Sequence, residues 1–345
     1  MEKFITQCFG VDISKLDFTV CLAKRTLSGE NRLSKTEKFE NSKQGFNQFL
    51  KWSMKLGDPG LKTLFLMEAT GVYYEPLAYH LHKLKKNVCV ILPNKVKHYA
   101  KSLNIKTKTD AVDSRIIAQL GVEREHLLWA PPLEIFKTLR ALTRLYTDLK
   151  QEVTVFSNRN ESLEFGEGTN TFILATNRRI LNELEKQIER CKEEIRRTIE
   201  SETWLEEKVK KLQTIKGVGF ITIAVIIAET QGFALIKNRK QLASYAGYDV
   251  VQRESGTSIK GKTRISKKGN SRIRACLHFP AMVASRHNSE LKEDYLRIIE
   301  NKPSKMVGMT ALQRKLLLLI YTLWKNGEVY QPDKLKPDNM QVKLP

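Results

Sequence analysis

The first 92 residues alternate between short apolar runs and longer amphipathic stretches, and this pattern limits the start of the chain to an α/β fold. We predict strands at Phe4–Asp12 and Phe18–Ala23, joined by the turn Ile13–Asp17. A helix at 43–56, a strand at 61–67, a helix at 73–86 and a strand at 87–92 follow. Two neighbouring strands followed by helix–strand units predict a mixed sheet with helices packed on it.

The charge of the chain points to a polyanionic partner. Its 345 residues include 59 Lys and Arg against 38 Asp and Glu, a formal net charge of +21. Such a surplus favours nucleic acid, because each phosphate that is neutralised releases condensed counterions. A ribosomal or membrane-surface protein is the plainer alternative.

The remaining composition favours a reducing compartment without membrane insertion. Five scattered Cys form no CxxC pair, which argues against zinc and against a disulfide scaffold. The first ten residues lack an apolar signal core, and the apolar stretches Ile221–Ala228 and Leu316–Tyr321 are too short to span a bilayer. We therefore expect a cytoplasmic protein.

The pattern changes along the chain and predicts four segments. Residues 1–130 form the α/β domain, 131–212 a charged helical coiled-coil linker, 213–330 a mostly helical domain, and 331–345 a loose tail. In the linker, Ile180–Ile199 carries an apolar stripe at three- and four-residue steps, and residues 158–170 are predicted to form a turn between two long helices. The stripe fits an internal helical pair and a dimerising arm equally well.

Four acids of the first domain form a candidate metal site. Asp12 and Glu68 each follow an apolar strand, while Asp110 and Asp113 are spaced to share one helix face. Clustered carboxylates repel one another unless a cation lies among them, and Mg²⁺ accepts oxygen ligands. Two such ions can hold the attacking and leaving oxygens of a phosphoryl transfer. Taken singly, Asp110 is better explained as a helix N-cap and Asp12 as a turn residue, but the four acids together favour a site.

A second candidate site surrounds Ser255, which precedes a glycine in a basic segment. A serine nucleophile would divide strand transfer into two steps through a covalent phosphoserine. From the residues alone, a phosphate contact or a turn is the more common role for such a serine. A third motif, residues 215–219 (IKGVG), precedes a predicted helix, where it serves either as a tight turn or as a phosphate contact of a helix-hairpin-helix.

Two lysine- and arginine-rich segments are candidate nucleic-acid-binding surfaces. Cations in these segments can contact phosphates and stabilise charge as it develops. The candidates are Lys95, Lys97, Lys101, Lys106, Lys108, Lys260, Lys262, Arg264, Lys267, Lys268, Arg272 and Arg274.

At these motifs the chain resembles the DEDD-type insertion-sequence transposases, the bridge-RNA-guided serine recombinases. Residues 10–15 (GVDISK), 68–73 (EATGVY), 92–97 (LPNKVK) and 108–118 (KTDAVDSRIIA) are similar to the family's N-terminal domain. Residues 215–229, 242–250, 254–270 and 279–284 are similar to its C-terminal transposase domain. One departure is Gly247–Val250, where members often carry Gly-Leu-x-Pro.

The resemblance implies a fold, a site and partners. It implies a ribonuclease H-like (RuvC-like) first domain, catalytic and metal-binding roles for Asp12, Glu68, Asp110 and Asp113 with Mg²⁺ or Mn²⁺, and a nucleophilic role for Ser255. It also implies donor and target DNA, a noncoding bridge RNA from the element, a homo-oligomer (dimer or tetramer), no membrane and a bacterial cytoplasmic location. A guide RNA would then choose the sequence while the protein reads shape and backbone.

Two alternatives remain open at this point. A metal-dependent, RuvC-like Holliday-junction resolvase or nuclease would cut with activated water and use Ser255 only to contact phosphate. An RNA-binding scaffold with a vestigial site would not cut at all.

Overall fold

The chain folds into two compact units, Met1–Pro131 and Pro132–Pro345. The computed structural model describes residues 3–69, 71–168, 170–234, 236–252, 254–255, 259–261, 263–300 and 304–331. The predicted division of the second unit at residue 212 stays a prediction.

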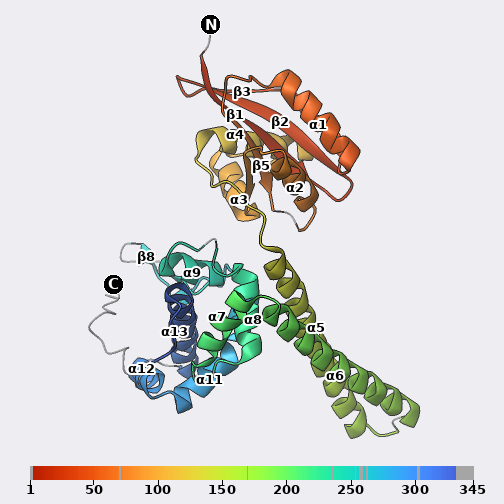
Figure 1. Ribbon diagram of the computed structural model, residues 1–345, viewed down its shortest axis with the longest axis vertical. Helices are drawn as coiled ribbons and strands as arrows, with labels where there is room; N and C mark the ends of the chain where they lie inside the picture. The colour runs from red at the N-terminus through yellow and green to blue at the C-terminus, as the bar shows by residue number, and fades with distance from the viewer. Residues whose placement is uncertain are drawn as a thin grey trace. The chain divides into compact units, whose positions relative to one another are not determined.

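The first unit is built on a mixed sheet (Figure 1). The strands are β1 (Phe4–Ile13), β2 (Asp17–Thr26), β3 (Asn31–Leu33), β4 (Glu37–Glu40), β5 (Thr63–Glu68) and β6 (Val88–Ile91). Their order is β3-β2-β1-β5-β6, and β4 pairs with β2. β1 is antiparallel to β2 and parallel to β5, and β5 is parallel to β6. The mixed α/β fold predicted from the sequence is confirmed.

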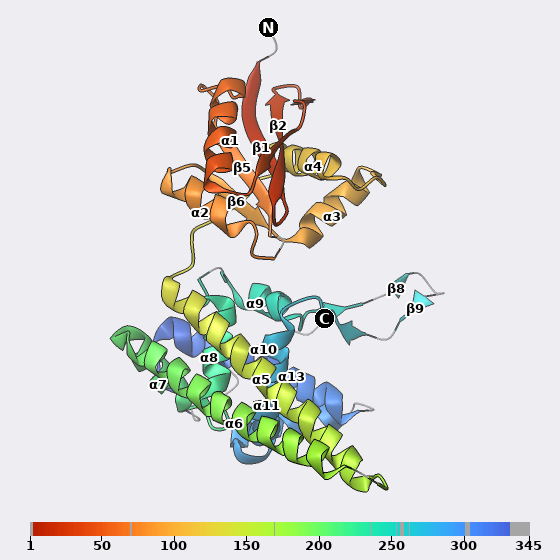
Figure 2. The same cartoon turned by 90° about the vertical axis from the view of Figure 1, so that its right-hand side faces the viewer.

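Helices cover both faces of this sheet because side chains alternate along each strand. Phe9 and Val11 of β1 face the core formed with α1 (Lys43–Leu56) and α2 (Glu75–Lys83). Cys8 faces the other core, formed with α3 (Pro93–Ser102) and α4 (Asp110–Glu123). Figure 2 shows α1 on one side of the strands and α4 on the other.

The predicted strands and helices of this unit are present, and β3, β4 and α3 occur in addition to them. β3 and β4 are three and four residues long and mostly exposed, so they carry no apolar run. Helix α3 begins at Pro93 and covers the first part of the lysine-rich stretch 95–108, where no helix is predicted; Val96 and Tyr99 are its buried residues.

The second unit begins with a long helical hairpin. α5 (Glu134–Phe165) and α6 (Thr171–Glu200) pack along each other, as Figure 1 shows. The turn predicted at 158–170 is wrong in its first half, because α5 continues to Phe165. Residues 158–165 are mostly polar but contain no Gly or Pro, and the helix ends only at Gly166.

Much of the apolar stripe of α6 is used within the chain. Ile188, Cys191, Ile195 and Ile199 are buried, and the last three belong to one core with Phe136 of α5. The internal reading of the stripe therefore holds for its C-terminal half. Exposed apolar side chains occur instead near the turn of the hairpin, at Phe165 and Phe172.

The rest of this unit is a helical core. Its helices are α7 (Thr203–Gln213), α8 (Phe220–Thr230), α9 (Arg239–Ala246), α10 (Ser271–Cys276), α11 (His278–His287), α12 (Ser289–Glu300) and α13 (Lys305–Asn326). Among the described residues, one helix, α13, has the length and the apolar composition needed to cross a membrane. Half of that apolar stretch is buried in the unit, where Leu316, Leu317 and Ile320 are inaccessible, as in the core helix of a globular domain.

A narrow β-ribbon leaves this core between α9 and α10. Its inner pair is β7 (Val250–Val251) with β10 (Arg264–Ile265), and its outer pair is β8 (Glu254–Ser255) with β9 (Ile259–Lys260). Both pairs are antiparallel. In Figure 2 the outer pair extends away from the helices of its own unit.

Candidate functional site

Asp12 and Glu68 lie next to each other because of the register of two parallel strands. Val11 of β1 is paired with Met67 of β5, so the next residue on each strand is one of the two acids. Successive side chains of a strand point to opposite faces of the sheet. Asp12 therefore lies on the same face as Gly10 and Cys8, and Glu68 lies on the same face as Leu66. Cys8 and Leu66 contact the α4 core. Both carboxylates therefore lie on the side of the sheet that α4 covers.

Helix α4 approaches this face closely because Gly10 has no side chain. A Cβ atom at residue 10 would come within 2.1 Å of the Ala118 backbone nitrogen and 2.5 Å of the Ser114 carbonyl oxygen. Gly121, further along α4, sits against Cys8 in the same way, with an added Cβ 2.2 Å from its Sγ. The glycine two residues before Asp12 thus brings the helix that carries the other two acids to the strand.

The first turn of α4 carries Asp110 and Asp113. The helix is capped by Thr109, whose hydroxyl accepts a hydrogen bond from the Val112 amide at 3.3 Å. The alternative that Asp110 serves as the N-cap is therefore wrong. Asp12 likewise lies within β1 and not in the turn, which is closed by Ser14 and Asp17. Neither acid has the plain structural role that its position in the sequence allowed.

The four acids act on one another electrostatically. Burial is the largest cause that raises the pKa of Asp12, from 3.8 to about 6. The carboxylates of Asp113, Asp110 and Glu68 raise it further, while Lys108 lowers it. Burial also raises the pKa of Asp113. Holding these ionised carboxylates together therefore lowers the free energy of unfolding, and such a loss is typical of a functional site.

Ser255 lies in the outer pair of the β-ribbon. It is paired with Ile259, and Glu254 with Lys260. Residues 256–258 lie outside the described residues, as do the Lys262 position and the side chain of Ser255. Two backbone hydrogen bonds join the strands at the ribbon's base. The Ser266 amide donates to the Asp249 carbonyl at 2.8 Å, and the Lys267 amide donates to the Gly247 carbonyl at 3.1 Å.

Comparison with known proteins identifies both parts of the chain. Residues 9–163 match the model for the DEDD domain of IS110 transposases, described as a transposase. Residues 209–296 match a transposase of the IS116/IS110/IS902 family. The chain carries the domains of an IS110-family transposase.

Two relatives extend over nearly the whole chain. The pilin gene-inverting protein of Moraxella bovis is 27% identical over 324 residues, which cover 93% of this chain and 96% of that protein. The pilin gene-inverting protein of Moraxella lacunata is 27% identical over 323 residues, with the same coverage. The transposase is therefore a DNA-acting enzyme.

The DEDD domain of the transposase indicates a divalent metal, and the donor chemistry of the acid cluster fits one. Carboxylate oxygens are the ligands that Mg²⁺ and Mn²⁺ prefer. Within the described part of the chain, no three His, Cys, Asp or Glu side chains form a ready-made cage. Mg²⁺ seldom needs such a cage, since it keeps several waters and uses one or two carboxylates together with substrate phosphates.

The lysines predicted to bind nucleic acid in the DEDD domain share the face of the acids. Lys95, Lys97 and Lys101 are exposed on α3, which packs on the same side of the sheet as α4. Lys106 and Lys108 are exposed in the segment between the two helices, and Lys108 influences the pKa of Asp12. A phosphate backbone that reached the acids would meet cations on this face.

The predicted basic residues of the transposase domain fall into two groups. Arg264, Lys267 and Lys268 are exposed. Arg272 and Arg274 already have partners within the chain, because Arg272 pairs with Asp148 at 3.3 Å and Arg274 donates to the Ala246 carbonyl at 2.7 Å. Their role in binding nucleic acid stays a prediction, as it does for Lys260 and Lys262.

The IKGVG motif forms a tight turn between α7 and α8. Gly217 has φ +92°, a conformation that favours glycine. Gly219 precedes α8, and a Cβ there would meet nothing within 4 Å. The turn predicted from the sequence is present, and a phosphate contact at Gly219 stays a prediction.

Replacing Asp12 by Asn should stabilise the transposase when cations are removed. The folded pKa of Asp12 is about 6 against 3.8 when unfolded, so this group lowers the free energy of unfolding as the pH rises between these values. Asn does not titrate. In EDTA, the melting temperature of Asp12→Asn should therefore exceed that of the wild type at neutral pH, and the difference should vanish as the pH falls through 3.8.

Thermal melts with added Mg²⁺ complete this test. The cation should raise the melting temperature of the wild type and have a smaller effect on Asp12→Asn. Glu125→Gln, an exposed acid beyond the opposite end of α4, is the control and should behave as the wild type does. An equal response of the wild type and Asp12→Asn to Mg²⁺ would rule out Asp12 as a ligand.

Proposed function

We propose that this transposase cuts and exchanges DNA strands through a covalent phosphoserine at Ser255, with Mg²⁺ or Mn²⁺ held by Asp12, Glu68, Asp110 and Asp113. The observation that carries the metal-dependent part of the proposal is the gathering of four carboxylates on one face by β1, β5 and α4. The transposase domains and the names of the DNA-inverting relatives support a strand-exchange reaction.

The chemistry conserves phosphodiester bonds. The Ser255 hydroxyl attacks a DNA phosphorus, a new Oγ–P bond forms, and the bond from phosphorus to one sugar oxygen breaks. The serine proton leaves to a base or water, and the departing sugar oxygen takes up a proton. A hydroxyl of the exchanged strand then attacks the phosphoserine and releases Ser255. No external energy source is needed, since each broken ester bond is replaced by another.

The residues of the chain would contribute in different ways. A divalent cation at the four acids would stabilise negative charge on the attacked phosphate. Exposed Arg264, Lys267 and Lys268 at the base of the ribbon would hold the DNA backbone through charge-assisted hydrogen bonds. Lys108, beside the acids, would hold the same strand near the carboxylates.

We further propose that a noncoding bridge RNA from the element pairs with donor and target DNA. The net charge of +21 and the exposed lysines of α3 support a large phosphate-bearing partner. We propose a homo-oligomer, a dimer or tetramer, because exchange of two strands needs two sites, and the exposed Phe165 and Phe172 are available for contact between copies. The reaction would take place in the bacterial cytoplasm.

The second candidate is a RuvC-like resolvase or nuclease in which water replaces Ser255 as the nucleophile. The acid cluster supports either reaction, because a cation there stabilises the attacked phosphate whichever oxygen attacks. A vestigial scaffold is disfavoured, because the fold keeps four mutually repelling carboxylates together.

The serine assignment is tested by trapping the intermediate on a nicked substrate and resolving the products on a denaturing gel. Ser255→Ala keeps the charge of the ribbon, so binding of DNA and RNA should survive while both adduct and product disappear. Ser258→Ala is the matched control and should only weaken activity. An adduct with Ser255→Ala would show that another residue is the nucleophile. Wild-type cutting with Mg²⁺ but without an adduct would establish the water mechanism.

The RNA proposal is tested by salt-dependent binding. Replacing Lys95, Lys97 and Lys101 by Gln should lower affinity for the element's noncoding RNA and reduce the salt slope by about two to three, since each phosphate contact contributes about 0.7–0.9. Lys51→Gln with Lys55→Gln is the control, because both residues are exposed on α1, against the opposite face of the sheet. Equal wild-type affinity for an unrelated RNA of the same length would exclude specific guidance.

A further inference from the structure

We propose that Glu229 is the positioning residue of the serine ribbon: its buried carboxylate fixes the ribbon's base to helix α5. This inference rests on the proposed role of Ser255. Glu229 lies at the end of α8, and its side chain is only 2% exposed. A buried acid of this kind is costly unless its oxygens are fully hydrogen-bonded.

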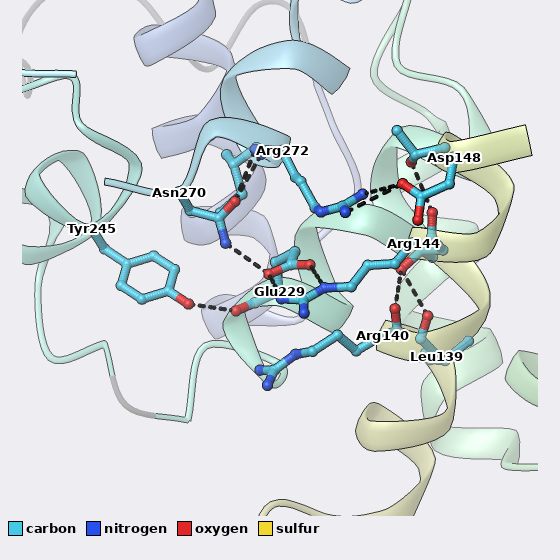
Figure 3. Close-up of polar contacts among 11 residues, drawn as sticks. Leu139, Arg140, Arg144, Asp148, Glu229, Tyr245, Asn270 and Arg272 are labelled. Carbon is cyan, nitrogen blue, oxygen red and sulfur yellow. Dashed lines mark hydrogen bonds and ion pairs between the residues drawn. The ribbon is translucent and has the colours of Figure 1, made fainter. Parts of the chain in front are cut away.

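Both oxygens of Glu229 are occupied by donors from different elements. Arg144 of α5 donates from Nε to Oε1 at 2.8 Å and from Nη2 to Oε2 at 3.1 Å. Asn270 donates from Nδ2 to Oε2 at 2.7 Å. Figure 3 shows the carboxylate between these two side chains. Burial raises the pKa of Glu229, but the hydrogen bonds from Arg144 and Asn270 outweigh it and lower the pKa overall.

Asn270 connects this carboxylate to the ribbon's return strand. Its Oδ1 accepts from the amides of Arg272 and Ile273 at 3.0 and 3.2 Å, so it also caps α10. The backbone amide of Asn270 donates to the Tyr245 carbonyl at 2.8 Å. The Tyr245 hydroxyl donates in turn to the Glu229 backbone carbonyl at 2.7 Å. The three residues form a closed ring of hydrogen bonds that joins α8, α9 and α10.

The ribbon leaves and re-enters the core within a few residues of this ring. Gly247, which follows α9, has φ +74° and accepts from the Lys267 amide at 3.1 Å. Gly269, which precedes Asn270, lies so close that a Cβ there would come within 2.4 Å of the Gly247 nitrogen. A shift of Asn270 is therefore transmitted directly to both strands of the ribbon's base.

Helix α5 is the fixed support in this arrangement. Arg144 reaches Glu229, and Asp148, four residues further along the same face, pairs with Arg272. The second pair is exposed, with its side chains 34% and 58% accessible, and such pairs contribute little. In the Arg144–Glu229 pair the Arg144 side chain is 46% exposed but the carboxylate is only 2% exposed, so this contact is the one that sets the geometry.

Glu229→Gln is the variant that separates positioning from packing. Glutamine has the same shape as glutamate, but only one of its two terminal atoms accepts hydrogen bonds. Its NH₂ group would therefore face an N–H donor of Arg144 or Asn270, and one hydrogen bond would be lost. Asp148→Asn, which weakens only the exposed pair, is the matched control. Asn270→Ser is a second variant, since serine still caps a helix but is too short to reach Glu229 in the same way.

The experiment uses the full chain with its nucleic acids bound and reads two quantities. In a single turnover on the trapping substrate, Glu229→Gln should form the adduct about 100-fold more slowly, because small misplacements of a nucleophile have effects of that size. DNA affinity should be unchanged. Hydrogen exchange at the amides of Lys267 and Asn270 should be about tenfold faster, as expected for losing a hydrogen bond to a charged group. Exchange in α13 should be unaffected, and Asp148→Asn should match the wild type in both measurements.

The outcomes distinguish this inference from the proposal on which it rests. Adduct formation by Glu229→Gln at the wild-type rate, or a loss that only follows lost DNA binding, would overturn the positioning role. If Glu229→Gln also speeds hydrogen exchange in α13, the same two measurements are made on Asn270→Ser, with the same expected changes. If the wild type forms no adduct, the serine mechanism fails, and the exchange of Lys267 and Asn270 still decides whether Glu229 anchors the ribbon.

Discussion

The absence of a side chain at residue 10 is the constraint on which the acid cluster depends. With any larger residue there, α4 would have to move away from β1, because a Cβ would overlap the helix backbone. Asp110 and Asp113 would then withdraw from Asp12 and Glu68. Asp12 is partly buried, and this burial, together with the charges of the other three acids, raises its pKa. Close packing therefore creates both the geometry of the cluster and the electrostatic strain that a cation relieves.

The second unit depends on a comparable feature, a buried carboxylate at the base of the β-ribbon. Among its described residues the β-ribbon has two pairs of two-residue strands, one at its base and one further out, and an isolated two-stranded ribbon is at best marginally stable in water. Its orientation is set where it joins the helices, by Glu229, Asn270 and the two glycines. A site built on such a ribbon needs support from rigid elements, and α5 and α8 provide it.

The sequence predicts the elements of this fold that have strong periodicity and misses those that depend on distant contacts. Helix 43–56 and the paired strands β1 and β2 could be predicted, because apolar spacing alone determines them. The extension of α5 to Phe165 is not predicted, since polar residues such as Asn160 are typical of turns, whereas in the structure α6 packs along α5 and Arg178 pairs with Glu164. Propensity is a weak guide where tertiary packing decides.

The candidate sites show the same division. That Asp12, Glu68, Asp110 and Asp113 lie together could be predicted, because two follow strands and two share a helix face; their role in binding metal stays a prediction. Glu229 could not, since an acid at the end of the apolar run 220–228 gives no sign of its partners Arg144 and Asn270, 85 and 41 residues away. A lone acid closing an otherwise apolar helix was the one available signal.

The most direct measurement is the location of the covalent bond between protein and DNA. The adduct would be trapped with Mg²⁺, digested with protease and nuclease, and its peptides sequenced by mass spectrometry. The account predicts a nucleotide phosphate on Ser255, absent when EDTA is present or when Asp113 is replaced by Ala. A nucleotide on any other side chain, or recombined product without a modified peptide, would contradict it.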